Sequence, residues 1–336
     1  MQMKKTKLFT SLITGTVLLT STPIITTGCS DSKVAEGNSI VLEKRDVYTL
    51  PDDFNPNILT SIGSNRIVKV PVLIDDTKQE VEIDVDKITS ISINSCDKSV
   101  TSIQNNFLND AKKITKIGIY GCSSITSIGN NFMKDCPRLQ SFSIGSSDDE
   151  DPKIKTIGDS FLEDCSMMYA VNLGSLYNSL RKIGNNFLKD CKSIWFCNVS
   201  NLIWLQSIGD NFMYGLSSLT DLFINNLFRL ETIGNHFMHG CSSLKTIDFS
   251  LDEKYYPYTW SQIDSIGEWF LNDCSGLLKI NMGKIKASTI TSPYPFCVSN
   301  NKDLAYTKGI TLSGSDKDNF IQSFPNLDIS PYRKWA

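Results

Sequence analysis

Histidine is scarce in this sequence, and neither sign of charge is in large excess. His236 and His239 are the two histidines among 336 residues, and 33 Lys and Arg against 36 Asp and Glu give a net charge of −3. Nucleophilic catalysis usually needs a histidine base that a third group holds in place, and nucleic-acid binding needs clustered Lys and Arg. A glycine-rich loop that could cradle phosphate is also missing. We therefore expect no enzyme, no catalytic residue, no cofactor and no nucleic-acid partner.

Residues 1–28 differ from the rest of the chain. The basic start MQMKKTK is followed by an uncharged stretch at 8–27 and then by Gly28 and Cys29. This order is typical of a lipoprotein signal peptide, in which the cysteine thiol receives diacylglycerol. An uncleaved anchor helix and ordinary secretion are the alternatives, because Thr26 stands where leucine is usual and the apolar stretch nearly reaches membrane-spanning length. We expect a chain anchored to the cell membrane by lipid on Cys29 and facing the extracellular side.

One block of sequence recurs seven times through the middle of the chain. Its pattern is I-x-x-I-G-x-x-F-[LM]-x-[DG]-C, and its second isoleucine recurs at steps of 25, 29, 26, 25, 25 and 33 residues. The two longer steps contain insertions, around 145–152 and 251–262. We expect a turn at the glycine and a short helical or 3₁₀ stretch, with the Phe, the Leu or Met and the Cys turned inward. The second isoleucines are Ile103, Ile128, Ile157, Ile183, Ile208, Ile233 and Ile266.

A second pattern, apolar-x-x-apolar-x-apolar, lies between successive blocks. Its last three positions alternate apolar, variable and apolar, which is the period of a strand with one buried face. A unit of about 25 residues cannot bury this face alone, whereas stacked copies bury a continuous core. The sequence therefore predicts a repeat solenoid. The segments begin at Ile88, Ile114, Leu139, Met168, Ile194, Leu219, Leu244 and Leu277.

These residues resemble the bacterial BspA-type leucine-rich repeat family, whose units run L-x-x-[LI]-x-[IL] and then I-x-x-I-G-x-x-[AS]-F-x-x-C. The resemblance covers about residues 88–282. It implies an α/β repeat solenoid, a leucine-rich-repeat array of seven to eight repeats of about 25 residues, with short parallel strands, short helical or 3₁₀ turns and a cap at each end. Gln104 departs from the first Gly of the pattern, Ala111 and Leu216 replace the Cys, and the proline common after the family's strand is missing.

The repeat pattern divides the chain that follows the signal peptide into four parts. The lipidated Cys and a polar tether occupy 29–45, an N-terminal cap 46–87, the leucine-rich repeats 88–284 and a C-terminal cap 285–336. Within the first cap, apolar and polar residues at 70–85 alternate on both sides of a polar turn. This pattern predicts a hairpin that closes the first rung, where a rung is one turn of the solenoid. Both ends need a cap because an open rung would expose apolar surface and unpaired backbone.

The cysteines and histidines are candidates for disulfides or a metal site. Five cysteines share one phase of the repeat, and rungs about 4.8 Å apart allow a disulfide. Since Ala111 and Leu216 fill the same slot, we favour a small buried apolar slot over a bridged or metal-binding ladder. His236 and His239 stand where other copies carry Asn, Lys or Tyr, and zinc needs three or four converging ligands, so we expect no metal. The five are Cys136, Cys165, Cys191, Cys241 and Cys274, while Cys197 is expected in the core and Cys96 and Cys122 partly exposed.

Exposed aromatic residues are the strongest indication of a partner-binding site. Phe196 and Phe223 occupy outward positions of neighbouring predicted strands, where most other residues are small or polar. Large apolar residues that gather on an exposed sheet often mark a binding surface, and aromatic loops provide rigid contact area. Burial by a neighbouring segment is the alternative for the strand pair and for the second insertion. The aromatic residues of that insertion are Tyr255, Tyr256, Tyr258 and Trp260.

The family resemblance implies a role in adhesion outside the cell. The expected partner is a host or matrix protein or a glycan, bound by an extended repeat surface on a lipid-anchored chain. A passive surface layer or antigenic spacer without a specific ligand is the alternative, since a fold does not fix a function.

Overall fold

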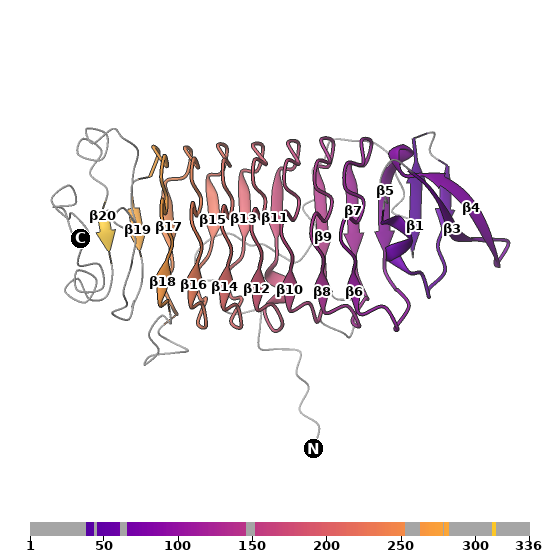
Figure 1. Cartoon of the computed structure of the whole chain (residues 1–336), viewed down its shortest axis with the longest axis horizontal. Helices are drawn as coiled ribbons and strands as arrows, with labels where there is room; N and C mark the ends of the chain where they lie inside the picture. Colours follow the sequence, from indigo (N-terminus) through magenta and orange to yellow (C-terminus); the bar gives the residue numbers. More distant parts are fainter. Residues whose placement is uncertain are drawn as a thin grey trace, which may run out of the picture. The chain divides into compact units, whose positions relative to one another are not determined.

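The computed structural model describes residues 38–43, 46–60, 66–145, 152–252 and 263–277, together with two further strands at Lys279–Asn281 and Thr311–Ser313. Within these residues the chain winds into a solenoid of short parallel strands (Figure 1). No helix in the described part is long and apolar enough to cross a membrane. The predicted signal peptide, the predicted lipidation site Cys29, the loop at 255–260 and all of the predicted C-terminal cap except the strand at 311–313 lie outside the described residues.

The apolar-x-x-apolar-x-apolar segments form parallel strands, as the sequence predicts. Neighbouring strands pair in register, so that Ile91 lies beside Ile117 and Cys197 beside Leu222. The first six segments belong to one sheet, called the first sheet below, and the last two belong to a three-stranded sheet that β20 (Thr311–Ser313) completes. The strands are β5 (Ile88–Ile93), β7 (Lys116–Ile119), β9 (Ser141–Ile144), β11 (Ala170–Asn172), β13 (Phe196–Asn198), β15 (Asp221–Phe223), β17 (Thr246–Asp248) and β19 (Lys279–Asn281).

Each phenylalanine block contributes a two-residue strand to a separate, seven-stranded sheet. The expected helical or 3₁₀ stretch is wrong for all seven blocks, because these contain only strand and turn. The 3₁₀ turns of the described part lie elsewhere, at η1 (Pro56–Leu59), η2 (Val85–Lys87) and η3 (Gly174–Leu176). The short strands are β6 (Ser102–Ile103), β8 (Ser127–Ile128), β10 (Thr156–Ile157), β12 (Lys182–Ile183), β14 (Ser207–Ile208), β16 (Thr232–Ile233) and β18 (Ser265–Ile266).

Alternating left-handed residues explain why no helix forms after the glycine. In the second block Asn131, Met133 and Asp135 have φ values of 56°, 49° and 59°, whereas a helix needs consecutive right-handed residues. Their N–H groups reach neighbouring rungs: that of Met133 donates to the carbonyl of Phe107 at 2.8 Å, and that of Asp135 to Glu163 at 2.9 Å. Hydrogen bonds between rungs therefore replace the bonds that a helix would make within one.

The centre of the solenoid is a single stack of phenylalanine rings. One fully buried ring comes from each block, and neighbouring centroids are 5.1 to 5.4 Å apart with nearly parallel planes. The Leu or Met next to each ring is also buried, as the sequence predicts. Every block thus contributes the same ring to one continuous core. The rings are those of Phe107, Phe132, Phe161, Phe187, Phe212, Phe237 and Phe270.

Four antiparallel strands cover the N-terminal edge of the first sheet, in the order β1, β2, β3, β4 outward from β5. The predicted hairpin forms from β3 (Ile67–Ile74) and β4 (Thr77–Asp84). It does not close the first rung itself, because β1 (Ser39–Leu42) pairs directly with β5 and β2 (Val47–Thr49) joins β1 to β3. Strand β1 lies within the predicted polar tether at 29–45, but its Ile40 is fully buried and pairs opposite Ile91.

Candidate functional site

An aromatic cluster formed by Trp195, Phe196 and Phe223 lies on the first sheet. The Trp195 and Phe223 side chains are 44% and 47% exposed, and Phe196 is half-buried. The ring of Phe196 lies 5.7 Å from that of Trp195 and 5.7 Å from that of Phe223, measured between centroids. The structure thus brings the two predicted phenylalanines together and leaves them accessible.

Sequence reasoning did not identify Trp195. It occupies the first variable position of apolar-x-x-apolar, before the strand alternation starts, and the alternation predicts an outward face only for the positions within it. A large apolar residue at either variable position would have been the signal, because both positions lie outside the core. The remaining predicted contacts, Tyr255, Tyr256, Tyr258 and Trp260, fall outside the described residues.

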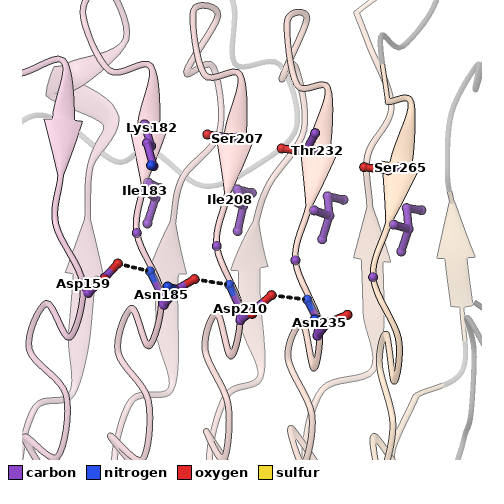
Figure 2. Close-up of a pocket in the computed structure, with 16 residues that line it drawn as sticks. Asp159, Lys182, Ile183, Asn185, Ser207, Ile208, Asp210, Thr232, Asn235 and Ser265 are labelled. Carbon is purple, nitrogen blue, oxygen red and sulfur yellow. Dashed lines mark hydrogen bonds between the residues drawn. The ribbon is translucent and has the colours of Figure 1, made fainter.

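A groove of about 530 Å³ runs along the seven-stranded sheet from β12 to β18 (Figure 2). One side carries Lys182 and then a row of hydroxyls from Ser207, Thr232 and Ser265, one from each strand. These three hydroxyls have no hydrogen-bond partner among the residues that the structure describes. They are available for an external ligand.

The opposite side of the groove is a ladder of Asp and Asn side chains that belongs to the fold. The Oδ1 atom of Asn185 accepts the N–H of Asp210 at 2.8 Å, and that of Asp210 accepts the N–H of Asn235 at 2.7 Å. The glycine before each of these residues leaves room for the ladder, since a Cβ on Gly209 would lie 2.5 Å from Asn185 Oδ1. Contact between rungs therefore explains why the motif I-G-[ND] repeats along this chain.

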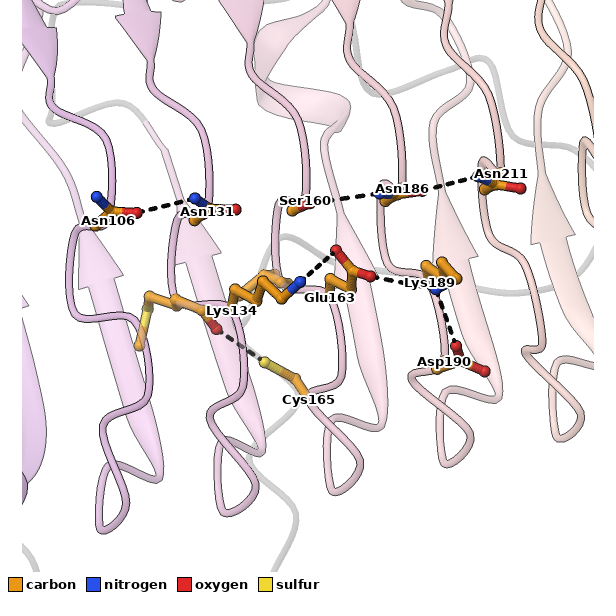
Figure 3. Close-up of polar contacts among 12 residues, drawn as sticks. Asn106, Asn131, Lys134, Ser160, Glu163, Cys165, Asn186, Lys189, Asp190 and Asn211 are labelled. Atoms are coloured by element: carbon orange, nitrogen blue, oxygen red, sulfur yellow. Dashed lines mark hydrogen bonds and ion pairs between the residues drawn. The ribbon is translucent and has the colours of Figure 1, made fainter.

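Further polar ladders join the turns of successive rungs (Figure 3). The amide of Asn131 donates to Asn106 Oδ1 at 2.9 Å, and three rungs further the amide of Asn211 donates to Asn186 Oδ1 at 2.9 Å. Between them Glu163 lies in a more buried position than the other charged residues of this edge.

Glu163 is an acidic group held between two lysines. Its carboxylate lies 3.2 Å from Lys134 Nζ and 3.3 Å from Lys189 Nζ, and its side chain is 5% exposed. Burial acts to raise the pKa of Glu163, but the hydrogen bonds from Ser160, Lys134 and Lys189 outweigh burial and lower it. The group therefore stays ionised and links three rungs.

The five cysteines of one phase are fully buried, as expected for a core slot, and their thiols are free. Each thiol also donates to the carbonyl of the Leu or Met in the preceding rung, at 2.9 to 3.2 Å, such as Cys191 Sγ to Leu162 O. Burial raises the pKa of the Cys136, Cys165 and Cys241 thiols. Cys197 is buried, Cys96 is 8% exposed and Cys122 is half-buried.

The two histidines take part in contacts between turns. The ring of His239 stacks on Tyr214 at 4.6 Å, its Nδ1 lies 2.9 Å from the Asn272 amide, and its Nε2 lies 3.3 Å from the Asp273 carboxylate. Burial lowers the pKa of His239 against the opposite effect of Asp273. Within the described residues no three His, Cys, Asp or Glu side chains converge as metal ligands. The geometry therefore accounts for His239 through stacking and hydrogen bonding.

Comparison with known proteins identifies one matching family. The model for the BspA type leucine rich repeat region matches in six copies, over residues 83–203 and 149–259. No curated protein matches the chain in sequence.

Several solved structures are similar to the chain. A leucine rich repeat protein of T. pallidum shares 17% identity with a TM-score of 0.34, over 55% of this chain and 90% of that one. A leucine rich cell surface protein from Faecalibacterium prausnitzii A2-165 shares 12% identity with a TM-score of 0.27, over 67% of this chain and 89% of that one. A leucine-rich repeat protein from Bacteroides ovatus ATCC 8483 shares 16% identity with a TM-score of 0.24, over 66% and 70%.

Proposed function

The chain belongs to the BspA-type leucine-rich repeat family, and on that premise we propose that it is a lipid-anchored adhesion protein that binds a host or matrix protein or a glycan outside the cell. Proteins of this family are typically found on the bacterial cell surface. The lipoprotein-type sequence ending at Gly28 and Cys29 supports display on the outer side of a membrane.

The observation that carries the proposal is the aromatic cluster. Three large aromatic side chains are in contact on one sheet face, and two of them are more than a third exposed. Leaving such apolar area in water has a free-energy cost, which a ligand that covers it removes. Aromatic residues are also enriched at the centre of protein interfaces.

Capture of host and matrix proteins and of glycans by the full-length chain tests this function. Trp195→Ser, Phe196→Ser and Phe223→Ser should each reduce capture, and deletion of 255–260 tests the loop separately. Met167→Ser is a matched control, because Met167 is 48% exposed and lies outside the cluster. Undiminished capture by all four variants would contradict the site. Absence of any captured partner would favour a passive surface-layer or antigenic spacer.

The anchoring step has its own test. Cys29→Ser removes the thiol that the lipid would modify, so the variant should appear in the soluble fraction while the wild type stays with the membrane. Equal membrane association of both proteins would contradict lipid anchoring at Cys29.

A further inference from the structure

Five exposed cations gather where the chain enters the seven-stranded sheet, and two of them, Arg181 and Arg229, lie over the ring of Trp204. We define the basic corner as Lys153, Lys155, Arg181, Lys182 and Arg229, all of which have exposed side chains. They precede or begin the short strands β10, β12 and β16. The corner therefore extends over several rungs. One of its members, Lys182, also lines the groove that carries the hydroxyl row.

The repeat brings these residues together. Lys155 and Arg181 occupy the same position in adjacent copies, and the N–H of Arg181 donates to the carbonyl of Lys155 at 2.8 Å. Trp204 and Arg229 likewise share one position. The guanidinium carbon of Arg229 lies 4.1 Å from the centre of the Trp204 ring, and that of Arg181 lies 5.9 Å from it. Arg229 thus stacks closely on the indole, and Arg181 makes a longer cation–π contact with the same ring.

Within the described part of the chain, the cations of the basic corner have no partner of opposite charge. Among the residues described, none of the five forms an ion pair with a carboxylate, in contrast to Lys134 and Lys189, which bind Glu163. The acidic residues at 148–151, which precede Lys153 in the sequence, lie outside the described residues. On a chain with a net charge of −3, such a concentration of positive charge favours an anionic ligand.

We propose that the basic corner and the adjoining hydroxyl row bind an acidic polysaccharide. Parallel rungs repeat about every 4.8 Å, a spacing comparable to the length of one sugar residue in an extended chain. Arginine forks bind carboxylate or sulfate groups through two hydrogen bonds, and the hydroxyls of Ser207, Thr232 and Ser265 can bond to sugar hydroxyls. The polysaccharide lies along the groove with its anionic groups at Lys155, Arg181 and Lys182.

Nucleic acid fits this surface less well. Single strands bind proteins by stacking bases on open aromatic faces, whereas the guanidinium of Arg229 covers Trp204 at 4.1 Å. The hydroxyl row beside the cations supplies hydrogen bonds that sugar rings use. The inference rests on the proposed display of the protein outside the cell, where such polysaccharides occur.

Binding of the full-length chain to heparin, a sulfated polysaccharide, tests the proposal, with dextran as the uncharged control. The Arg181→Gln/Lys182→Gln and Lys153→Gln/Lys155→Gln variants should each bind heparin about tenfold more weakly than wild type. Lys69→Gln/Lys98→Gln removes the same charge from exposed positions outside the corner and should stay within about twofold, because distant exposed charges are screened. Thermal unfolding should be unchanged in all three.

Several outcomes would overturn the proposal. Heparin and dextran could bind equally, the control variant could lose as much affinity as the corner variants, or a single-stranded oligonucleotide could compete fully through the same residues. Trp195→Ser should bind heparin as wild type does. Failure of the aromatic cluster as an adhesion site is therefore distinguishable from failure of the basic corner.

Discussion

At the scale of single residues, the Leu or Met beside each buried Phe has an unusual conformation. Leu188 and Met213 have φ values of 56° and 55°, although a positive φ is uncommon for bulky residues. Three interactions compensate: the side chain is buried, its N–H donates to the preceding rung, and its carbonyl accepts a hydrogen bond, from the Cys191 N–H at Leu188 and from the Cys241 thiol at Met213. The sequence predicted the burial of these residues correctly and their helical environment wrongly, because both conformations can turn the same side chains inward.

Glu163 provides a prediction at this scale. Replacing it by Gln should destabilise the protein by about 1–2 kcal/mol at neutral pH, because two lysine contacts lose their charged acceptor. The pKa of Glu163 is lowered from its ordinary value of 4.5, so its stabilising effect is complete above that value and is lost as the pH falls below it. Urea unfolding of wild type and variant should therefore converge at acidic pH.

A matched control exists for this experiment. Asp53 pairs with Lys78 at 2.7 Å, but its side chain is 62% exposed, and exposed pairs contribute little. Asp53→Asn should leave the unfolding midpoint nearly unchanged. A difference between Glu163→Gln and wild type that stays constant with pH would contradict the role assigned to the carboxylate.

At the scale of the structural element, the rung is predictable from sequence to different degrees. Period-2 alternation predicts all eight strands of the apolar-x-x-apolar-x-apolar segments, because a strand with one buried face needs apolar residues at alternate positions. The two-residue strands such as β12 (Lys182–Ile183) are too short to show any alternation. Strand β1 lies in the predicted tether, because four residues between polar segments are too few to show a hydrophobic period. Its partner β5 is also distant in sequence.

The glycine that follows the second isoleucine of the block provides a prediction at the scale of the rung. Alanine usually stabilises a chain relative to glycine where the backbone allows it. At Gly209, however, the new Cβ would lie 2.5 Å from Asn185 Oδ1 and 2.6 Å from the carbonyl carbon of Gly184. Gly209→Ala should therefore destabilise the protein by about 1–3 kcal/mol, as overpacking does, in chemical denaturation.

Gly174→Ala is the comparison variant. Its Cβ would meet only side-chain atoms, with Asn172 Oδ1 nearest at 3.0 Å, and these can rotate away. The loss of stability should be clearly smaller than at Gly209. Equal effects at both positions would mean that contact between rungs does not explain the glycine.

At the scale of the whole molecule, stability comes from contacts between neighbours. Every Phe ring in the interior of the stack touches the ring before and the ring after it, so Phe187 contacts Phe161 and Phe212. The solenoid was predictable because the repeat period is visible in the sequence. The aromatic cluster was predictable only in part, since Trp195 stands outside the strand alternation and the exposure of Phe223 depends on what covers the sheet.

Phe187→Ala tests this dependence on neighbours. Removing a fully buried ring should cost about 3–5 kcal/mol. Because the change interrupts the stack in its middle, unfolding should separate into two transitions rather than one. Hydrogen exchange should increase first in the rungs that contain Phe161 and Phe212. A single transition with uniform exchange along the chain would instead indicate that the rungs unfold as one cooperative unit.

Contacts between rungs are of two kinds. One kind repeats from rung to rung, and the other occurs at single places along the array. The phenylalanine stack and the Asp and Asn ladder repeat nearly unchanged, so a chain that paired each rung with the wrong neighbour would recover most of them. The Lys134–Glu163–Lys189 bridges and the Tyr214–His239 stack occur only in the native order. These few side chains make shifted assemblies less stable than the native one, and so allow near-identical units to assemble in a single sequence.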